Sequence, residues 1–147
     1  MRFRGAGTAD LAQLETLLTA NQLPPEGVAE HIGDFVVAED HGRIQGAIGL
    51  ERYGAYGLLR SAVVAPRARG SGVGTRLVTE LIARAKVSGV DELYLLTTTA
   101  EKYFPRFGFE RATRADVPAA VKQSVEFRGA CPDTAIVMRR VLNETHQ

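Results

Sequence analysis

Residues 69–75 form a glycine-rich segment whose composition suits the binding of a pyrophosphate. The segment reads Arg-Gly-Ser-Gly-Val-Gly-Thr and lies between an apolar stretch that ends at Pro66 and a long amphipathic stretch. Glycines let the main chain turn tightly and approach a ligand, and the first turn of a following helix directs unpaired N–H groups at an anion. Three arginines add positive charge in or beside the segment: Arg67, Arg69 and Arg76. The spacing therefore predicts a phosphate-binding loop at a helix N-terminus.

The hydrophobic pattern predicts the elements that position this loop. Residues 58–65 are almost continuously apolar, as expected for a strand that is covered on both faces. Residues 72–88 repeat apolar side chains at helical spacing before Gly89, and residues 93–98 predict another strand. A strand, helix and strand of this length form a parallel pair with a right-handed crossover, so we expect the loop at the carboxyl end of the first strand.

Further helices and strands are expected around this unit. Asp40-His41-Gly42 predicts a hairpin turn, Thr8 is expected to cap the first helix, and residues 116–127 give no clear pattern. The other expected strands lie near Phe3 and over 35–38, 43–50, from 109 onward and over 134–142, and the other expected helices cover 10–20, 25–32 and 100–107. Together they indicate one α/β (α+β) domain over residues 1–147, with a mixed central sheet of about six to seven strands and about four helices.

Length and charge restrict the partners to be expected. The 147 residues are enough to bury a core without metal or disulfide support. With 18 basic and 17 acidic residues, the net charge of +1 gives no reason to expect nucleic acid or an anionic membrane as a partner. The single cysteine, Cys131, excludes an internal disulfide, and without a membrane-span or signal-peptide pattern a cytoplasmic location is expected. The histidines lack metal-ligand spacing, so no metal site is predicted.

Two motifs make the chain resemble the GNAT superfamily of N-acetyltransferases. The first runs from Val63 to Gly74 and contains an arginine and two glycines in the pattern R-x-x-G-x-G after the strand and its proline. The second runs from Ala100 to Phe109 and ends in Gly-Phe. With the order of elements, the resemblance covers nearly the whole chain. It implies the GNAT fold with splayed parallel strands four and five, acetyl-coenzyme A as cofactor, and a small-molecule amine as the acceptor that attacks directly in a ternary complex.

This resemblance also implies which residues would hold the cofactor. It would lie between strands four and five, where the backbone of Ala62, Val63 and Val64 would pair with its pantetheine amides as another strand does. The N–H of Val64 would donate to the thioester carbonyl oxygen as negative charge develops. The pyrophosphate would be held by the loop residues Arg69, Gly70, Ser71, Gly72, Val73, Gly74 and Thr75.

Further segments resemble two groups within the superfamily, the arsenic-resistance N-acetyltransferases and the acetyltransferase domain of N-acetylglutamate synthase. The segments are residues 49–54, 58–61, 94–98 and 124–132. This likeness implies that the acceptor is the α-amine of a small amino acid or of a glutamate-like analogue such as arsinothricin. One thiol cannot chelate arsenic, so no metalloid-binding site is expected.

Acetyl transfer to an ammonium group needs a proton acceptor, because an α-amine with a pKa of about 8 is mostly charged at neutral pH. Glu51 and Glu126 are the candidates for this base or for the group that binds the amine. Tyr103 is the candidate for the acid that protonates the sulfur, because the position of the usual tyrosine of the family holds Phe104. Many members also carry a glutamate where Leu58 stands, so the base comes from elsewhere or is water.

Arg60 stands inside the apolar fourth strand, where burial of an unpaired charge costs too much. Its partner is either Glu51, as a structural ion pair, or the carboxylate of the acceptor, which is slightly favoured. Ser61, Thr98 and His31 are further candidates for contact with the acceptor. Cys131 is expected to be an unreactive buried thiol rather than an acyl carrier.

Other interpretations of the glycine loop fit less well. A nucleotide P-loop closes with Gly-Lys-Ser/Thr, which is absent here, and a dinucleotide-binding loop directly follows its strand and needs an acid after the next strand. Two alternatives to an acetyltransferase of small amines stay open: a non-catalytic acyl-coenzyme A sensor and a protein or peptide N-terminal acetyltransferase. The oligomeric state is also open, with a homodimer among the alternatives.

Overall fold

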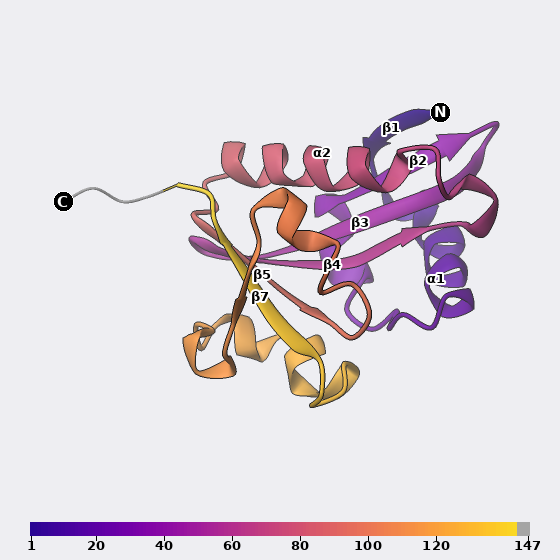
Figure 1. The fold of residues 1–147 in the computed structure, drawn as a ribbon. Coiled ribbons are helices and arrows are strands. Elements are labelled where there is room, and N and C mark those ends of the chain that lie inside the picture. Colours follow the sequence, from indigo (N-terminus) through magenta and orange to yellow (C-terminus); the bar gives the residue numbers. More distant parts are fainter. Residues whose placement is uncertain (144–147) are drawn as a thin grey trace.

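The structure is a computed structural model that describes residues 1–143 and contains a seven-stranded mixed sheet (Figure 1). Its order is β1-β2-β3-β4-β5-β7-β6, and within the described residues the pair β4–β5 is the parallel one. The strands are β1 Arg2–Gly5, β2 Phe35–Asp40, β3 Arg43–Tyr53, β4 Tyr56–Val64, β5 Glu92–Thr97, β6 Glu110–Ala112 and β7 Ile136–Val141. The expected mixed sheet with parallel strands four and five is confirmed.

The two α-helices of the described residues cover opposite faces of the sheet. Helix α2, Val73–Val87, lies along one face and buries the apolar stripe expected from its sequence (Figure 1). Helix α1, Leu11–Ala20, packs on the other face, where Leu14 and Leu18 meet alternate residues of β2. Alternation along a strand sends successive side chains to opposite faces, so β2 contributes Val36 and Ala38 to the core beneath α2 and Phe35 and Val37 to the core beneath α1. Neither these helices nor any other within residues 1–143 has the length and hydrophobicity to cross a membrane.

Two of the expected helices are single 3₁₀ segments. The stretch 25–32 contains Gly27 at φ 82, and only η2, Ala29–Asp34, is helical there. The stretch 100–107 contains a proline that removes a backbone donor, and its helical part is η4, Phe104–Phe107.

The prediction that Thr8 caps the first helix was wrong. The first helical turn, η1 Thr8–Asp10, is capped by Gly7. The amide of Gly7 donates to the carboxylate of Asp10 at 2.8 Å, and the amide of Asp10 donates back to the carbonyl of Gly7 at 2.9 Å. The carboxylate of Asp10, and not the hydroxyl of Thr8, therefore makes the capping hydrogen bond of this turn.

The segment between β6 and β7 consists of three short helical turns that cover the sheet on the α1 side. They are η5 Arg114–Asp116, η6 Val121–Gln123 and η7 Glu126–Ala130, drawn in orange below β5 and β7 in Figure 1. Val117 and Val121 pack on Leu58 and Tyr94 of the two central strands. This packing fixes Glu126 against the middle of β4.

Strands β4 and β5 separate soon after they pair. Their parallel register joins only Tyr56–Leu58 to Glu92–Tyr94, whereas β4 continues to Val64 and β5 to Thr97 (Figure 1). On the other side of β4, the pairing with β3 shifts by one residue, and Ser61 takes a left-handed φ of 60°. Such a bulge bends a strand and increases its twist, which favours the divergence of β4 from β5.

Candidate active site

The glycine-rich loop lies at the carboxyl end of β4, as its sequence predicts. A 3₁₀ turn, η3 Pro66–Ala68, follows the strand, and Gly72 is the N-cap of α2 with a φ of 83°. Glycine adopts this left-handed conformation without strain, and no atom lies within 4 Å of the place that a Cβ would take. The loop lines a hollow of about 440 Å³ together with Val64 and Tyr103. An open backbone at a helix N-terminus fits a pyrophosphate.

Arg69 supplies positive charge at this hollow. Its guanidinium donates to the carbonyl of Val64 at 3.1 Å and to Oδ1 of Asn21 at 2.9 Å. Both acceptors are neutral, so the positive charge of Arg69 is not balanced by these contacts. Arg76 instead stacks over the ring of Phe3, 4.4 Å from its centroid. The expected loop residues line this hollow except Ser71, whose hydroxyl donates to the carbonyl of Ala68 at 2.6 Å.

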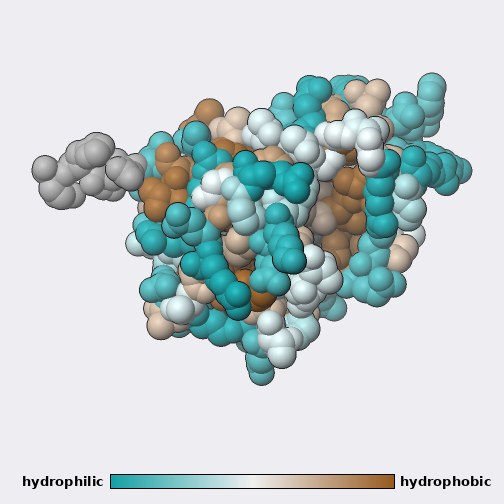
Figure 2. Space-filling model, viewed as in Figure 1, coloured by the Kyte–Doolittle hydropathy of each residue, from teal (hydrophilic) through white to brown (hydrophobic). Residues whose placement is uncertain are grey.

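A second cavity, of about 300 Å³, lies between β4 and β5 where the two strands diverge. Its walls are β4 from Leu59 to Val64 and the chain from Leu95 to Ala100, which includes Thr98. It shares Val64, Gly74 and Tyr103 with the loop hollow, so the two form one cleft. Figure 2 shows a hollow on this face beside the N-terminal end of α2, with hydrophobic side chains at its base.

The backbone of Val64 faces this gap. The amide of Ala65 donates to the carbonyl of Gln45 on the β3 side at 2.7 Å. Successive residues of a strand direct their backbone groups to opposite edges, so the N–H and C=O of Val64 point toward β5. The contact between Arg69 and the carbonyl of Val64 agrees with this orientation.

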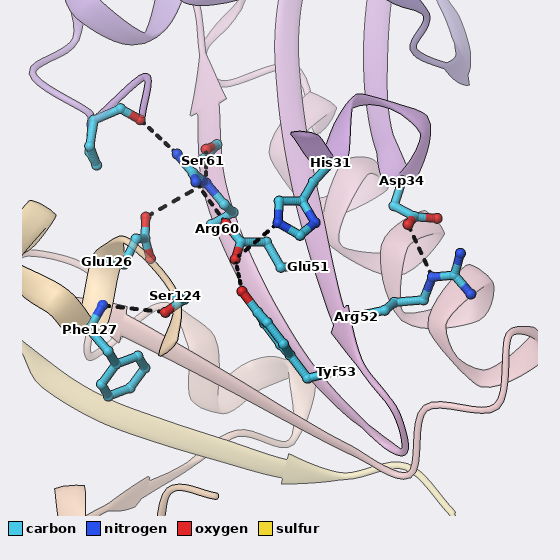
Figure 3. Close-up of polar contacts among 11 residues, drawn as sticks. His31, Asp34, Glu51, Arg52, Tyr53, Arg60, Ser61, Ser124, Glu126 and Phe127 are labelled. Carbon is cyan, nitrogen blue, oxygen red and sulfur yellow. Dashed lines mark hydrogen bonds and ion pairs between the residues drawn. The ribbon is translucent and has the colours of Figure 1, made fainter. Parts of the chain in front are cut away.

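At the inner end of the cleft, Arg60 is surrounded by protein acceptors (Figure 3). Its side chain has no exposed surface. Nη1 donates to Oε2 of Glu51 at 2.8 Å, Nη2 to the carbonyl of Pro24 at 2.9 Å, and Nε to Oγ of Ser61 at 2.9 Å. Of the two partners considered from the sequence, Glu51 is the one that Arg60 meets in this structure.

Glu51 is enclosed on its other side as well. The hydroxyl of Tyr53 donates to Oε1, and Nε2 of His31 lies 3.5 Å from the same oxygen (Figure 3). Burial, and then the hydrogen bond to Glu51, raise the pKa of Tyr53 above its ordinary value. Glu51 and His31 are not among the residues that line the cleft, so both lie behind Arg60 as seen from the cavity.

Glu126 lines the cleft and is 5 % exposed. Its Oε2 lies 3.9 Å from Nε of Arg60, and the described residues give its carboxylate no hydrogen bond. Burial raises the pKa of Glu126 to about 7, and this effect exceeds the lowering by Arg60. A carboxylate with such a pKa is divided between its two protonation states at neutral pH, which suits a general base.

Tyr103 stands where the two parts of the cleft join. A Cβ on Gly74 would lie 3.3 Å from its hydroxyl oxygen. Its ring packs edge-on against Phe104 and Phe107, with centroids 5.4 and 5.3 Å apart. Phe104 itself is 5 % exposed and belongs to the core beneath α2. The hydroxyl that faces the cleft in this segment is therefore that of Tyr103.

Cys131 also lines the cleft. Burial, followed by the negative charge of Glu126, raises the pKa of its thiol to about 12. Because the thiolate is the nucleophilic form, Cys131 is a poor acyl carrier at neutral pH.

Sequence reasoning missed two members of the polar cluster. Tyr53 follows Glu51 by two residues and so shares its face of β3, a spacing that identifies it as a neighbour. The carbonyl of Pro24 carries no such signal, because it belongs to a loop that only the tertiary structure brings to Arg60.

Comparison with known proteins identifies the family. The Acetyltransferase (GNAT) domain matches residues 31–111. The chain belongs to the GNAT acetyltransferase family. The GNAT acetyltransferase family and its fold, both expected from the sequence, are thereby confirmed, and acetyl-coenzyme A is the cofactor of this family.

Two curated relatives of this GNAT chain carry the name amino-acid acetyltransferase. The protein of Neisseria meningitidis serogroup B is 26% identical over 118 residues, which are 79% of this chain and 27% of that protein. The protein of Ralstonia nicotianae is 39% identical over 89 residues, which are 59% of this chain and 20% of that protein. The chain thus corresponds to a minor part of the length of these relatives.

Among solved structures, N-acetylglutamate synthase from Neisseria gonorrhoeae, complexed with coenzyme A and N-acetyl-glutamate, shares the fold. Its TM-score is 0.82 at 23% identity, over 97% of this chain and 35% of that chain. The resemblance to the acetyltransferase domain of N-acetylglutamate synthase is confirmed, whereas the resemblance to the arsenic-resistance group stays a prediction.

Proposed function

We propose that this protein is an acetyl-coenzyme A-dependent N-acetyltransferase that acts on the α-amine of a small amino acid or of a glutamate-like analogue such as arsinothricin. One observation carries the proposal. A continuous cleft leads from an open phosphate-binding loop to Glu126, a buried carboxylate with a pKa of about 7. The names of the amino-acid acetyltransferases to which the chain is similar support the class of acceptor.

In this proposal, each part of the cleft has one task. Residues 69–75 hold the pyrophosphate, and the edge of β4 from Ala62 to Val64 aligns the pantetheine arm. When bound, acetyl-coenzyme A supplies the acetyl group as a thioester. Glu126 accepts the proton that the acceptor's ammonium must lose, and the Val64 N–H is the donor for an oxyanion. Tyr103, at the junction, is the candidate to return a proton to the sulfur.

The lining of the cleft around Arg60 supports a small acceptor. Leu23, Pro24, Cys131 and Pro132 line the cleft together with Arg60, and this cover favours a small molecule over a peptide. A guanidinium has five N–H donors, and three protein acceptors occupy one donor on each nitrogen of Arg60. The remaining two are the donors that the carboxylate of an amino acid would use, and because the side chain has no exposed surface in this structure, such a contact requires it to become accessible.

The test is the release of coenzyme A from acetyl-coenzyme A in the presence of free amino acids, glutamate and arsinothricin among them, with a short peptide included. We expect turnover with a small amino acid or a glutamate-like compound and none with the peptide, because the residues that line the cleft around Arg60 favour a small acceptor. Mass spectrometry of the product shows whether the acetyl group is on the α-amine. Turnover with the peptide alone would instead favour an N-terminal acetyltransferase.

A non-catalytic sensor of acyl-coenzyme A is the second candidate. The observation behind it is the burial of Phe104 at the position where many members of the family carry a tyrosine. A sensor would bind coenzyme A in calorimetry and release none from acetyl-coenzyme A with any acceptor. Binding and turnover measured on the same preparation therefore separate the two functions.

A further inference from the structure

Two carboxylates approach the single buried arginine of the cleft from different parts of the chain. Oε2 of Glu51, on β3, accepts from Nη1 of Arg60 at 2.8 Å. Oε2 of Glu126, on η7, stands 3.9 Å from Nε of the same side chain, beyond hydrogen-bond range (Figure 3). The arginine is therefore shared unequally, and the carboxylate on the cavity side is the one that lacks a hydrogen bond.

The surroundings of Glu51 maintain this unequal sharing. Tyr53 and His31 contact its second oxygen and so fix the orientation of the carboxylate. The carbonyl of Pro24 accepts from Nη2 of Arg60, and the backbone of Gly27 packs against Nη1, where a Cβ would lie 3.0 Å away. The guanidinium is thus held at Nη1 and Nη2 by Glu51 and the carbonyl of Pro24, whereas Glu126 stands beside Nε.

We propose that Glu51 is a positioning residue, which holds Arg60 by its far edge and thereby leaves Glu126 free to accept the proton of the acceptor's ammonium. The catalytic part of this statement rests on the proposed function. The competition of Glu51 and Glu126 for Arg60 does not depend on the proposed function, because all three groups belong to this chain.

The ionisation of Glu126 supports this arrangement. A carboxylate beside an arginine usually has a lowered pKa, yet that of Glu126 is raised to about 7. The ionisable groups that face it are Arg60 on β4, Glu51 and Tyr53 on β3, and Cys131 on its own segment. Of these only Arg60 is a cation, and its hydrogen bonds go to other acceptors.

The experiment is a ¹³C NMR titration of the glutamate side-chain carboxyls, with Glu126 assigned by the loss of its signal in Glu126→Gln. In the unsubstituted protein we expect a midpoint of about 7. In Glu51→Gln we expect a fall of roughly one to three pH units, because the negative charge of Glu51, which raises the pKa of Glu126, is removed and Arg60 is free to pair with Glu126. Glu51→Gln leaves one cation and one carboxylate in the cluster, so the charges of this variant remain balanced.

The double variant Glu51→Gln with Arg60→Met is the control, since it removes Glu51 without releasing a cation toward Glu126. In this variant the midpoint of Glu126 should not fall. An unchanged midpoint in Glu51→Gln, or an equal fall in both variants, would overturn the proposal. The titration needs no acceptor, so its outcome is independent of whether the proposed function is correct.

A kinetic measurement tests the catalytic part. If turnover is found, the acidic limb of the kcat/KM profile should move to lower pH in Glu51→Gln, by the same shift as the NMR midpoint. Loss of activity to an equal extent at every pH, with the limb unmoved, would show that Glu51 only supports the structure and would contradict the positioning role.

Discussion

The charge of Glu126 is coupled to folding because its carboxyl is buried. Its pKa is raised from an ordinary 4.5 to about 7 in the folded protein. The folded state therefore retains a proton that the unfolded chain releases at lower pH, so the stabilisation is complete below pH 4.5 and is lost as the pH rises to about 7. Burial of an ionised carboxylate accounts for this loss.

Glu126→Gln should remove this pH dependence. Between pH 5 and pH 8 the unsubstituted protein should lose roughly 2 to 3 kcal/mol more unfolding free energy than the variant, from the difference between the two pKa values. Urea denaturation of both proteins at the two pH values measures the difference. Parallel pH profiles for the two proteins would mean that Glu126 titrates normally.

Residue types that do chemistry could be read from the sequence, but their pairing could not. Arg60 stood out because an arginine in an apolar strand needs a carboxylate, and Glu51 was one of its two expected partners. A further acceptor of Arg60 is the carbonyl of Pro24, 36 residues away along the chain. The spacing of charges along a sequence contains no information on such a backbone contact.

At the scale of elements, Gly27 connects the loop after α1 to the polar cluster. Its φ is 82°, and a Cβ would lie 3.0 Å from Nη1 of Arg60 and 3.1 Å from Cγ2 of Val125, the neighbour of Glu126. Gly27→Ala should therefore destabilise the protein by roughly 1 to 3 kcal/mol, through backbone strain and crowding. Denaturation curves in urea measure the loss.

Gly33→Ala is the matched control for this substitution. Gly33 lies nearby in η2, has no positive φ, and has no atom within 4 Å of a Cβ position. We expect its free energy of unfolding to change little or to rise slightly, as for alanine replacing glycine in a helix. Equal losses in the two variants would refute the close packing of Gly27 against Arg60.

Helices and strands that are stabilised by residues close in sequence could be predicted, whereas those stabilised by distant residues could not. The unit β4, α2 and β5 could be predicted because its hydrophobic pattern is continuous and its glycines stand at the helix ends. Residues 25–32 and 100–107 form only short 3₁₀ segments, since a glycine or a proline interrupts each. The turns within 114–130 had no local signal because their stability comes from packing on Leu58 and Tyr94.

For the whole molecule, we expect cofactor binding to raise stability, because a ligand that binds only the folded protein shifts the unfolding equilibrium toward it. A ligand at 100 times its Kd adds about 2.7 kcal/mol to the unfolding free energy. For a chain of this size, such a gain raises the Tm by roughly 5 to 10 °C. We expect coenzyme A to produce this shift in a thermal denaturation assay.

Gly72→Glu should abolish the shift, because a carboxylate at the N-cap of α2 repels the pyrophosphate. Gly42→Glu is the control. Gly42 has a similar φ of 77°, also has no atom within 4 Å of a Cβ position, and lies in the hairpin turn after β2. Both variants have the same backbone strain, so only the first should lose the response to coenzyme A. A full shift in Gly72→Glu would exclude the loop as the phosphate site.

Because β4 pairs with β5 over only three residues, the rest of β4 has an unpaired backbone edge in the middle of the sheet. Beyond Leu58 and Tyr94 the facing backbones of the two strands are not joined in the ladder. An open edge at the rim of a sheet can recruit strands of other chains and promote aggregation. Here the edge lines a cleft inside the molecule, so we expect it to accept a slender molecule with its own amides more readily than a strand of another chain.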